Sequence, residues 1–237
     1  MSIPIYVINF KDDVRKEKMI NRFNNLGFNL HFVPPVTKED SRLDIPNVNF
    51  DKRTWSIMLQ HLDSIKHFYE NTTDDHCIVC EDDILISKNF KSELPTILQN
   101  FKDLNLDILL LGYLFPHKLY NTYFSFKSTT KINYTYHNYP DDLWGCQMYL
   151  ISRSYAKFLL DKYTLEFAVS NLNDPPYNPD WIITKNGNRA IIHPLIAVEE
   201  GDTKTDHSGQ NDFHRNCFLC NYNPDAENII RVIFQFT

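Results

Sequence analysis

The feature that most constrains this chain is a short apolar run that ends abruptly in three acidic residues. Residues 76–80 are mainly apolar, and Glu81, Asp82 and Asp83 follow at once. An apolar run of this length, bounded by polar segments, predicts a buried strand. In open sheets of alternating strands and helices, ligands gather outside the carboxyl ends of the strands. We therefore expect the three acidic residues at a ligand-binding edge of a sheet.

Strand-like runs alternate with amphipathic helical patterns along the rest of the chain. Further strands are expected over residues 5–10, 30–33, 107–111 and 147–151. Helices are expected after the capping segment Lys11-Asp12-Asp13, from Asp51, over residues 90–101 and from Ser152. This alternation predicts an α/β fold, and 237 residues suffice for one domain that spans residues 1–237.

Composition and charge exclude several classes of function. The formal net charge is -6, whereas broad binding of a phosphate backbone needs a surplus of Lys and Arg, so nucleic acid is not an expected partner. The apolar segment at residues 3–8 comes too early for a signal peptide, and the longest apolar runs are too short to span a membrane. We therefore expect a soluble, cytoplasmic protein with no signal peptide and no membrane span.

Five cysteines raise the question of a structural zinc site. Cys77 and Cys80 share the spacing of a zinc knuckle with Cys217 and Cys220. The first pair, however, lies in an unbroken strand-like run, where residues three apart point to opposite faces and cannot bind one ion. Free buried thiols are the better interpretation.

The acidic cluster is the candidate metal site. Glu81, Asp82 and Asp83 concentrate more negative charge than a folded chain normally holds without a cation or a basic partner. Oxygen ligands suit Mg²⁺ or Mn²⁺, which bind one or two carboxylates together with substrate phosphates. Glu81 and Asp83 occupy alternate positions that project to the same side, so they are the expected ligands. A solvated acidic turn is the alternative, and charge alone leaves both open.

Four segments resemble glycosyltransferase family 25, the group of lipopolysaccharide and procollagen galactosyltransferases. The acidic cluster with its strand is similar to the family's Glu-Asp-Asp metal motif, its counterpart of D-x-D. The segment from Trp55 to His61 resembles a family helix that usually ends in Ser-His, although Gln60 replaces the serine. The other two matching segments are residues 5–10 with Arg15, and residues 144–153 with Ala156.

The resemblance implies a GT-A-like fold with a Rossmann-like mixed sheet flanked by helices. It also implies a nucleotide-sugar donor, a divalent metal on the donor diphosphate, and transfer with inversion. Galactose or glucose from a UDP-sugar is the expected donor. The resemblance assigns Ile8, Asn9 and Arg15 to the nucleotide end of the donor, with Asp82 on the same ligand. The acceptor is expected to be a glycan, a lipid-glycan or a hydroxylated protein.

Inversion by direct displacement needs a carboxylate that takes the proton of the acceptor hydroxyl. Asp180 is the expected base, because it follows a proline-rich loop, begins an apolar helical stretch, and the family holds an acidic residue at a comparable place. A helix cap is the alternative role for Asp180. Asp141 and Asp142 form the competing pair, and Asp142 is the second candidate for a catalytic or acceptor-orienting role.

A late histidine often closes the metal site of GT-A enzymes, and His207 is the candidate here. Imidazole is an acceptable ligand for Mn²⁺ and a poorer one for Mg²⁺, so a His207 ligand favours manganese as the cofactor. A surface-loop histidine is the alternative. His193 lies in an apolar run and is expected to be structural, and nothing favours His214.

Two other classes of function stay open. A metal-dependent phosphohydrolase would also use an acidic cluster at a strand end, although the usual second cluster of ligands is missing. The second class is a binding module, that is, a transferase-like domain that has lost its activity. The intact acidic cluster argues against this class. Residues 113–139 lack a clear period and residues 165–181 are rich in Asn and Pro, so both segments are candidate substrate loops.

Overall fold

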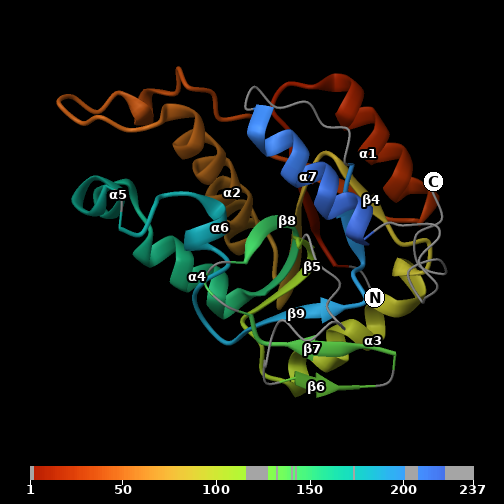
Figure 1. Cartoon of the computed structure of the whole chain (residues 1–237). Helices are drawn as coiled ribbons and strands as arrows, with labels where there is room; N and C mark the ends of the chain where they lie inside the picture. The colour runs from red at the N-terminus through yellow and green to blue at the C-terminus, as the bar shows by residue number, and fades with distance from the viewer. Residues whose placement is uncertain are drawn as a thin grey trace.

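The computed structural model describes residues 3–115, 128–131, 133–139, 141, 143–172, 174–200 and 208–221. Its centre is an eight-stranded sheet with the order β2-β1-β3-β8-β5-β9-β7-β6 (Figure 1). The strands are β1 Ile5–Ile8, β2 Leu30–Phe32, β3 His76–Glu81, β5 Ile108–Leu114, β6 Ser128–Thr130, β7 Thr135–His137, β8 Trp144–Ser152 and β9 Arg189–His193. The sheet is mixed, because β8 and β7 run against their neighbours while β1, β2, β3, β5 and β9 run in one direction.

Helices cover both faces of this sheet, as the sequence predicted for an α/β fold. One face packs on α1 Asp13–Asn25 and α3 Phe90–Asp103, and the other on α2 Lys52–Asn71 and α4 Arg153–Lys162. Buried residues of one strand alternate between the two layers: Ile5 and Val7 belong to the first, Tyr6 and Ile8 to the second. Within the described residues, no helix combines the length and apolar character needed to cross a membrane.

The helix starts follow the capping residues that the sequence indicated. Asp12, Asp51 and Ser152 each accept a hydrogen bond from a backbone N–H in the first turn of α1, α2 and α4. Gly27 follows α1 with a φ of +76°, a conformation that glycine adopts without strain. The shorter helices are η1 Ser41–Leu43, α5 Leu165–Asn171 and α6 Pro179–Ile182.

A second, two-stranded sheet was not predicted from the sequence. It joins β4 Ile84–Ile86, directly after the acidic cluster, to β10 Ala197–Glu199 in antiparallel pairing. The helix α7 Ser208–Asn221 contacts β10 and β5. The segment expected as an irregular loop at residues 113–139 contains the β6–β7 hairpin among its described residues.

Candidate active site at the carboxyl ends of the strands

Sheet register brings distant segments of the chain to one edge. In the parallel pair β1–β3, Ile8 lies opposite Glu81, so both strands end side by side. Because β8 is antiparallel to β3 and β5, it begins at this same edge, and its first residue Trp144 pairs with Leu114 at the end of β5. The acidic cluster, Asn9 and the start of β8 are therefore neighbours, as expected for ligand sites in such sheets.

Asn9 and Arg15 bind the acidic cluster directly. The Asn9 side-chain amide donates to Asp82 Oδ2 at 2.6 Å. The Arg15 guanidinium donates to Asp82 Oδ1 at 3.1 Å and to Asp83 Oδ2 at 3.4 Å. Burial raises the pKa of Asp82, and the bonds from Asn9 and Arg15 oppose this shift. Asn9 and Arg15, two of the residues that the resemblance assigned to the donor, therefore lie beside the cluster.

Glu81 turns toward the layer formed by α2 and the start of β8. The Cys146 thiol lies 3.6 Å from Glu81 Oε1. Ligand atoms of His61, Glu81 and Cys146 all lie within 4.8 Å of one another. Burial raises the pKa of Glu81 well above its usual range, and repulsion from Asp83, Glu199 and Asp180 adds to the shift.

The two-stranded sheet adds a carboxylate and a histidine that the sequence analysis did not assign. Glu199 pairs with Ile84, and the backbone N–H of Glu200 donates to the carbonyl oxygen of Asp83 at 2.7 Å. His214 Nδ1 lies 2.6 Å and 2.8 Å from the two carboxylate oxygens of Glu199. The bond to Glu199 raises the pKa of His214, with further contributions from Asp83 and Asp180.

The sequence favoured no role for His214, and the structure places it beside Glu199. A signal for it existed in the sequence, since His214, Cys217 and Phe218 recur at helical spacing. In α7 this spacing directs Cys217 and Phe218 into the core and His214 toward Glu199.

Asp180 is held at the start of β8 by the backbone. The Gly145 N–H donates to Asp180 Oδ1 at 2.7 Å. Asp180 is not the cap of its helix, because Asn178 occupies the N-cap of α6 and accepts from Trp181 N at 3.0 Å. Burial raises the pKa of Asp180, while the bond from Gly145 lowers it. The capping alternative is therefore wrong, and a role at the site remains.

The other residues singled out from the sequence lie elsewhere or outside the description. Asp142 and His207 lie outside the described residues. Asp141 is exposed and pairs with Arg189 at 2.6 Å. His193 lies on β9 beside His137, with ring centroids 6.3 Å apart, in keeping with a structural histidine. Cys77 and Cys80 belong to opposite layers of the core, so the expectation that they cannot share one ion is confirmed.

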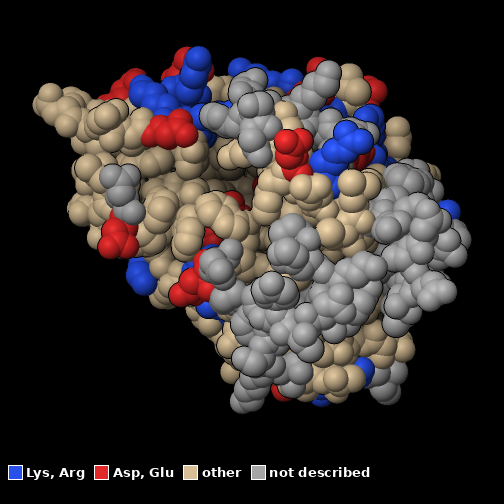
Figure 2. All heavy atoms as spheres, viewed as in Figure 1, with Lys and Arg blue, Asp and Glu red and all other residues tan. Residues whose placement is uncertain are grey.

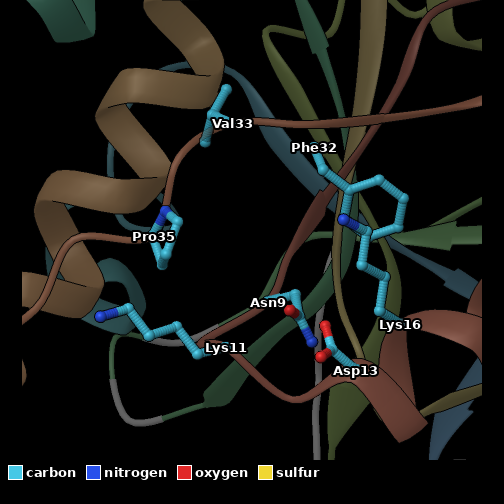
Figure 3. Close-up of a pocket in the computed structure, with 7 residues that line it drawn as sticks. All are labelled: Asn9, Lys11, Asp13, Lys16, Phe32, Val33 and Pro35. Atoms are coloured by element: carbon cyan, nitrogen blue, oxygen red, sulfur yellow. The ribbon is translucent and has the colours of Figure 1, made fainter.

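A pocket of about 290 Å³ adjoins Asn9 at the ends of β1 and β2. Figure 3 shows Asn9 between Asp13 and Lys11, with Phe32 and Lys16 on one side and Pro35 opposite. The Lys16 ammonium lies 4.9 Å from the centre of the Phe32 ring. Figure 2 shows the face of the molecule that is viewed in Figure 1. This face is hollowed between α2 and α7, and acidic atoms are visible in the hollow.

Two tryptophans stand next to Asp180. Trp144 and Trp181 meet edge to face with ring centroids 5.5 Å apart, and Trp144 is 43% exposed. Lys185 lies over the Trp181 ring at 5.6 Å. An exposed indole beside a carboxylate forms a flat apolar surface of the kind on which sugar rings stack.

A mixed α/β sheet with acidic side chains at its carboxyl-terminal edge is the arrangement of many enzymes that bind phosphorylated ligands. The model of one family, described as glycosyltransferase family 25 (LPS biosynthesis protein), matches residues 2–172. The chain therefore belongs to glycosyltransferase family 25 and is a glycosyltransferase. The matched residues include Asn9, Arg15 and the acidic cluster, whereas Asp180, Glu199 and His214 lie beyond them.

Comparison with solved structures gives distant similarities. A structure described as A197 from STIV is 11% identical, covers 84% of this chain and 85% of its own, and has a TM-score of 0.43. A glycosyltransferase involved in the glycosylation of the major capsid of PBCV-1 is 10% identical, covers 92% of this chain and 100% of its own, and has a TM-score of 0.44. Scores at this level do not establish a shared mechanism. No curated protein sequence matches the chain.

Proposed function

We propose that this glycosyltransferase uses a divalent metal and a UDP-sugar donor with a GT-A-like arrangement, and transfers a hexose to a hydroxyl acceptor with inversion. The observation that carries the proposal is the convergence of carboxylates at one sheet edge. Burial raises the pKa of Glu81, and repulsion from Asp83, Glu199 and Asp180 raises it further; burial also raises the pKa of Asp180. Such a cluster is costly unless a cation offsets it.

The donor set supports a hard divalent ion. We propose Asp83 and Glu81 as its ligands, with oxygen atoms that suit Mn²⁺ or Mg²⁺. His214 lies in this neighbourhood and favours Mn²⁺, because imidazole suits it better than Mg²⁺. Such an ion would supply Lewis-acid stabilisation to the leaving diphosphate. His207, which lies outside the described residues, is proposed as the alternative imidazole ligand.

The nucleotide is proposed to occupy the pocket beside Asn9. Its place at the ends of β1 and β2 is where nucleotides bind in sheets of this type. Phe32 offers an aromatic face for a base, and Lys11 and Lys16 supply positive charge for the ribose-phosphate side. Arg15, already bound to Asp82 and Asp83, is placed to meet a diphosphate held by the same cluster.

Asp180 is the proposed base, and Trp144 the proposed platform for the acceptor sugar. Burial raises the pKa of Asp180 toward the range in which a carboxylate serves as a base near neutrality. The family description names LPS biosynthesis, which favours a lipid-linked glycan acceptor, with other glycans and hydroxylated proteins as alternatives. The exposed indole next to Asp180 fits a saccharide acceptor better than a small alcohol.

The test replaces one metal ligand. Asp83→Asn preserves the size of the side chain but removes its charge, so Mn²⁺-dependent stabilisation by UDP should disappear while the protein stays folded. At a ligand concentration of 100 times Kd, the parent should gain about 2.7 kcal/mol. Asp161→Asn, an equal charge change on the exposed surface of α4, should leave the stabilisation intact.

Product analysis with labelled UDP-galactose and UDP-glucose completes the experiment. Transfer to an added saccharide supports the proposal, whereas release of free sugar without transfer would favour the phosphohydrolase alternative. Nucleotide binding without any turnover in a broad acceptor screen would favour an inactive binding module. Metal-dependent binding unchanged in Asp83→Asn would contradict the ligand assignment.

A further inference from the structure

A second set of potential metal ligands lies on the inner side of Glu81. The set consists of His61 on α2, Glu81 at the end of β3 and Cys146 on β8, and their ligand atoms lie within 4.8 Å of one another. His61 is fully buried, and Cys146 is 4% exposed. Three elements far apart in the chain therefore bring a nitrogen, a sulfur and an oxygen ligand to one point.

The orientation of His61 is set by its other ring nitrogen. His61 Nδ1 lies 3.0 Å from the Tyr149 hydroxyl, and the two rings are stacked. His61 Nε2, the other nitrogen of the ring, is buried and makes no hydrogen bond. A buried polar atom without a partner costs about 1–3 kcal/mol, so this nitrogen needs an explanation. Metal-bound histidines are held in this way, with one nitrogen on the metal and the other fixed by a hydrogen bond.

The chemistry of the three ligands differs from that of the acidic cluster. A thiolate and an imidazole select borderline transition metals such as Zn²⁺, whereas Mg²⁺ and Mn²⁺ prefer oxygen. The 3.6 Å between Cys146 Sγ and Glu81 Oε1 matches the separation of two ligands on one tetrahedral Zn²⁺ ion. Three protein ligands leave one tetrahedral position for water.

We propose that His61 Nε2, Cys146 Sγ and a carboxylate oxygen of Glu81 form a second metal site, selective for Zn²⁺ or a similar transition metal. Glu81 has two oxygens, so one ligates here while the other faces Asp83 and the donor metal. The bound ion would join α2, β3 and β8 beneath the active site and offset part of the negative charge on Glu81. The site shares Glu81 with the proposed donor metal, but none of its ligands comes from the nucleotide or the acceptor.

Co²⁺ is the probe, because a thiolate ligand gives it a near-ultraviolet charge-transfer band. Chelator-treated full-length protein titrated with Co²⁺ should develop this band to one equivalent, and Zn²⁺ should abolish it by displacement. Mn²⁺ with UDP should not displace it. Absence of the band in the folded parent protein would overturn the proposal.

Three variants assign the ligands. Cys146→Ser should remove the band, while Cys80→Ser, a buried thiol of β3 in the opposite layer, should retain it. Tyr149→Phe keeps the ring and deletes only the hydroxyl that orients His61, so the band should persist with metal affinity about 10–100-fold weaker. A band that survives in Cys146→Ser, or unchanged affinity in Tyr149→Phe, would contradict the assignment.

The outcome is separable from that of the proposed function. Loss of sugar transfer in Asp83→Asn with an intact cobalt band would leave the second site standing. Metal-dependent transfer in a parent protein that gives no cobalt band would leave the proposed function standing and remove the second site. Circular dichroism and thermal melting of each variant show that the changes act on a folded chain.

Discussion

At the scale of single residues, neighbours give the clustered carboxylates different surroundings. Asp82 accepts from Asn9 and Arg15, so its charge is largely met by the protein itself. Glu81 lies against Cys146, and burial together with repulsion from the nearby carboxylates raises its pKa. Asp180 accepts a hydrogen bond from the Gly145 N–H, and this bond and the one from the Cys146 thiol both lower its pKa, against the effect of burial.

Replacement of Asp180 by Asn should separate chemistry from binding. The amide oxygen can still accept from Gly145, but the side chain can no longer take a proton. We expect transfer to fall by about two to four orders of magnitude, with donor affinity unchanged. Single-turnover rates and UDP-sugar titrations measure the two effects. Asp141→Asn, on the surface beside Arg189, is the matched control and should transfer at the parental rate. Loss of transfer in the control and not in Asp180→Asn would move the base to that segment.

Arg15 should contribute to donor affinity through its guanidinium. Charge-assisted hydrogen bonds are worth about 1.5–3 kcal/mol, so Arg15→Ala should weaken UDP-sugar binding by about 10–100-fold. Calorimetry at low and high salt gives the affinity. Lys66→Ala, an equal charge change on the exposed face of α2, should have no such effect. Equal affinity of parent and Arg15→Ala at both salt concentrations would make Arg15 a residue that only neutralises Asp82.

At the scale of elements, the start of β8 depends on one glycine. Gly145 has a φ of +111°, and a Cβ there would lie 2.6 Å from the backbone nitrogen of Leu114. Gly145→Ala should therefore cost on the order of 1–3 kcal/mol and displace the N–H that holds Asp180. Urea unfolding and steady-state kinetics report the two effects.

Gly187 supplies the matched comparison for this substitution. It also has a positive φ, of +71°, and meets Asp107 and Tyr155 far from the site. Gly187→Ala should lose comparable stability yet keep kcat in the folded protein. Equal losses of kcat in both variants would show that Gly145 acts through stability alone.

Elements with local signals were predictable from the sequence, and those that need distant partners were not. The helices after Asp12, Asp51 and Ser152 carry a cap and an apolar stripe, and each formed where expected. The strand β4 has three residues and, among the described residues, pairs only with β10, so no local period marks it. The pairing of Glu199 with Ile84 sets the position of the Glu199 carboxylate that contacts His214. The spacing of residues along the chain does not indicate this contact.

The same distinction between local signals and distant contacts applies to the residues of the candidate site. Asn9, Arg15 and the acidic cluster follow strand ends, and strand ends are visible in an apolar pattern. His61 was part of a recognised segment, but its approach to Cys146 depends on the antiparallel insertion of β8 beside β3. Burial of both side chains from solvent is a tertiary property, and no pattern within α2 or β8 indicates it.

For the whole molecule, acid stability should depend on the histidine pair between β7 and β9. Burial and the neighbouring His137 lower the pKa of His193 from 6.5 to about 4. The unfolded chain therefore binds more protons between these values, so stability falls as the pH drops through this window. Between pH 7 and pH 5 the loss should be about 1–2 kcal/mol.

Urea unfolding of His193→Gln at both pH values checks this assignment. Glutamine does not titrate, so the variant should lose less stability than the parent over the same interval. His76→Gln, another half-buried histidine whose pKa burial lowers, tests whether the effect belongs to the β7–β9 pair. An acid response in His193→Gln as steep as that of the parent would show that other groups govern it.

The pairing of β4 with β10 has a consequence for the growing chain. The acidic turn leaves the ribosome long before β10 and α7 are synthesised, because these elements lie far later in the sequence. Until they emerge, Asp83 lacks the backbone partner from Glu200, and Glu199 and His214 are absent from its surroundings. Domains fold as units during synthesis, so we expect the centre to assemble, and sugar transfer to begin, only after translation has passed α7.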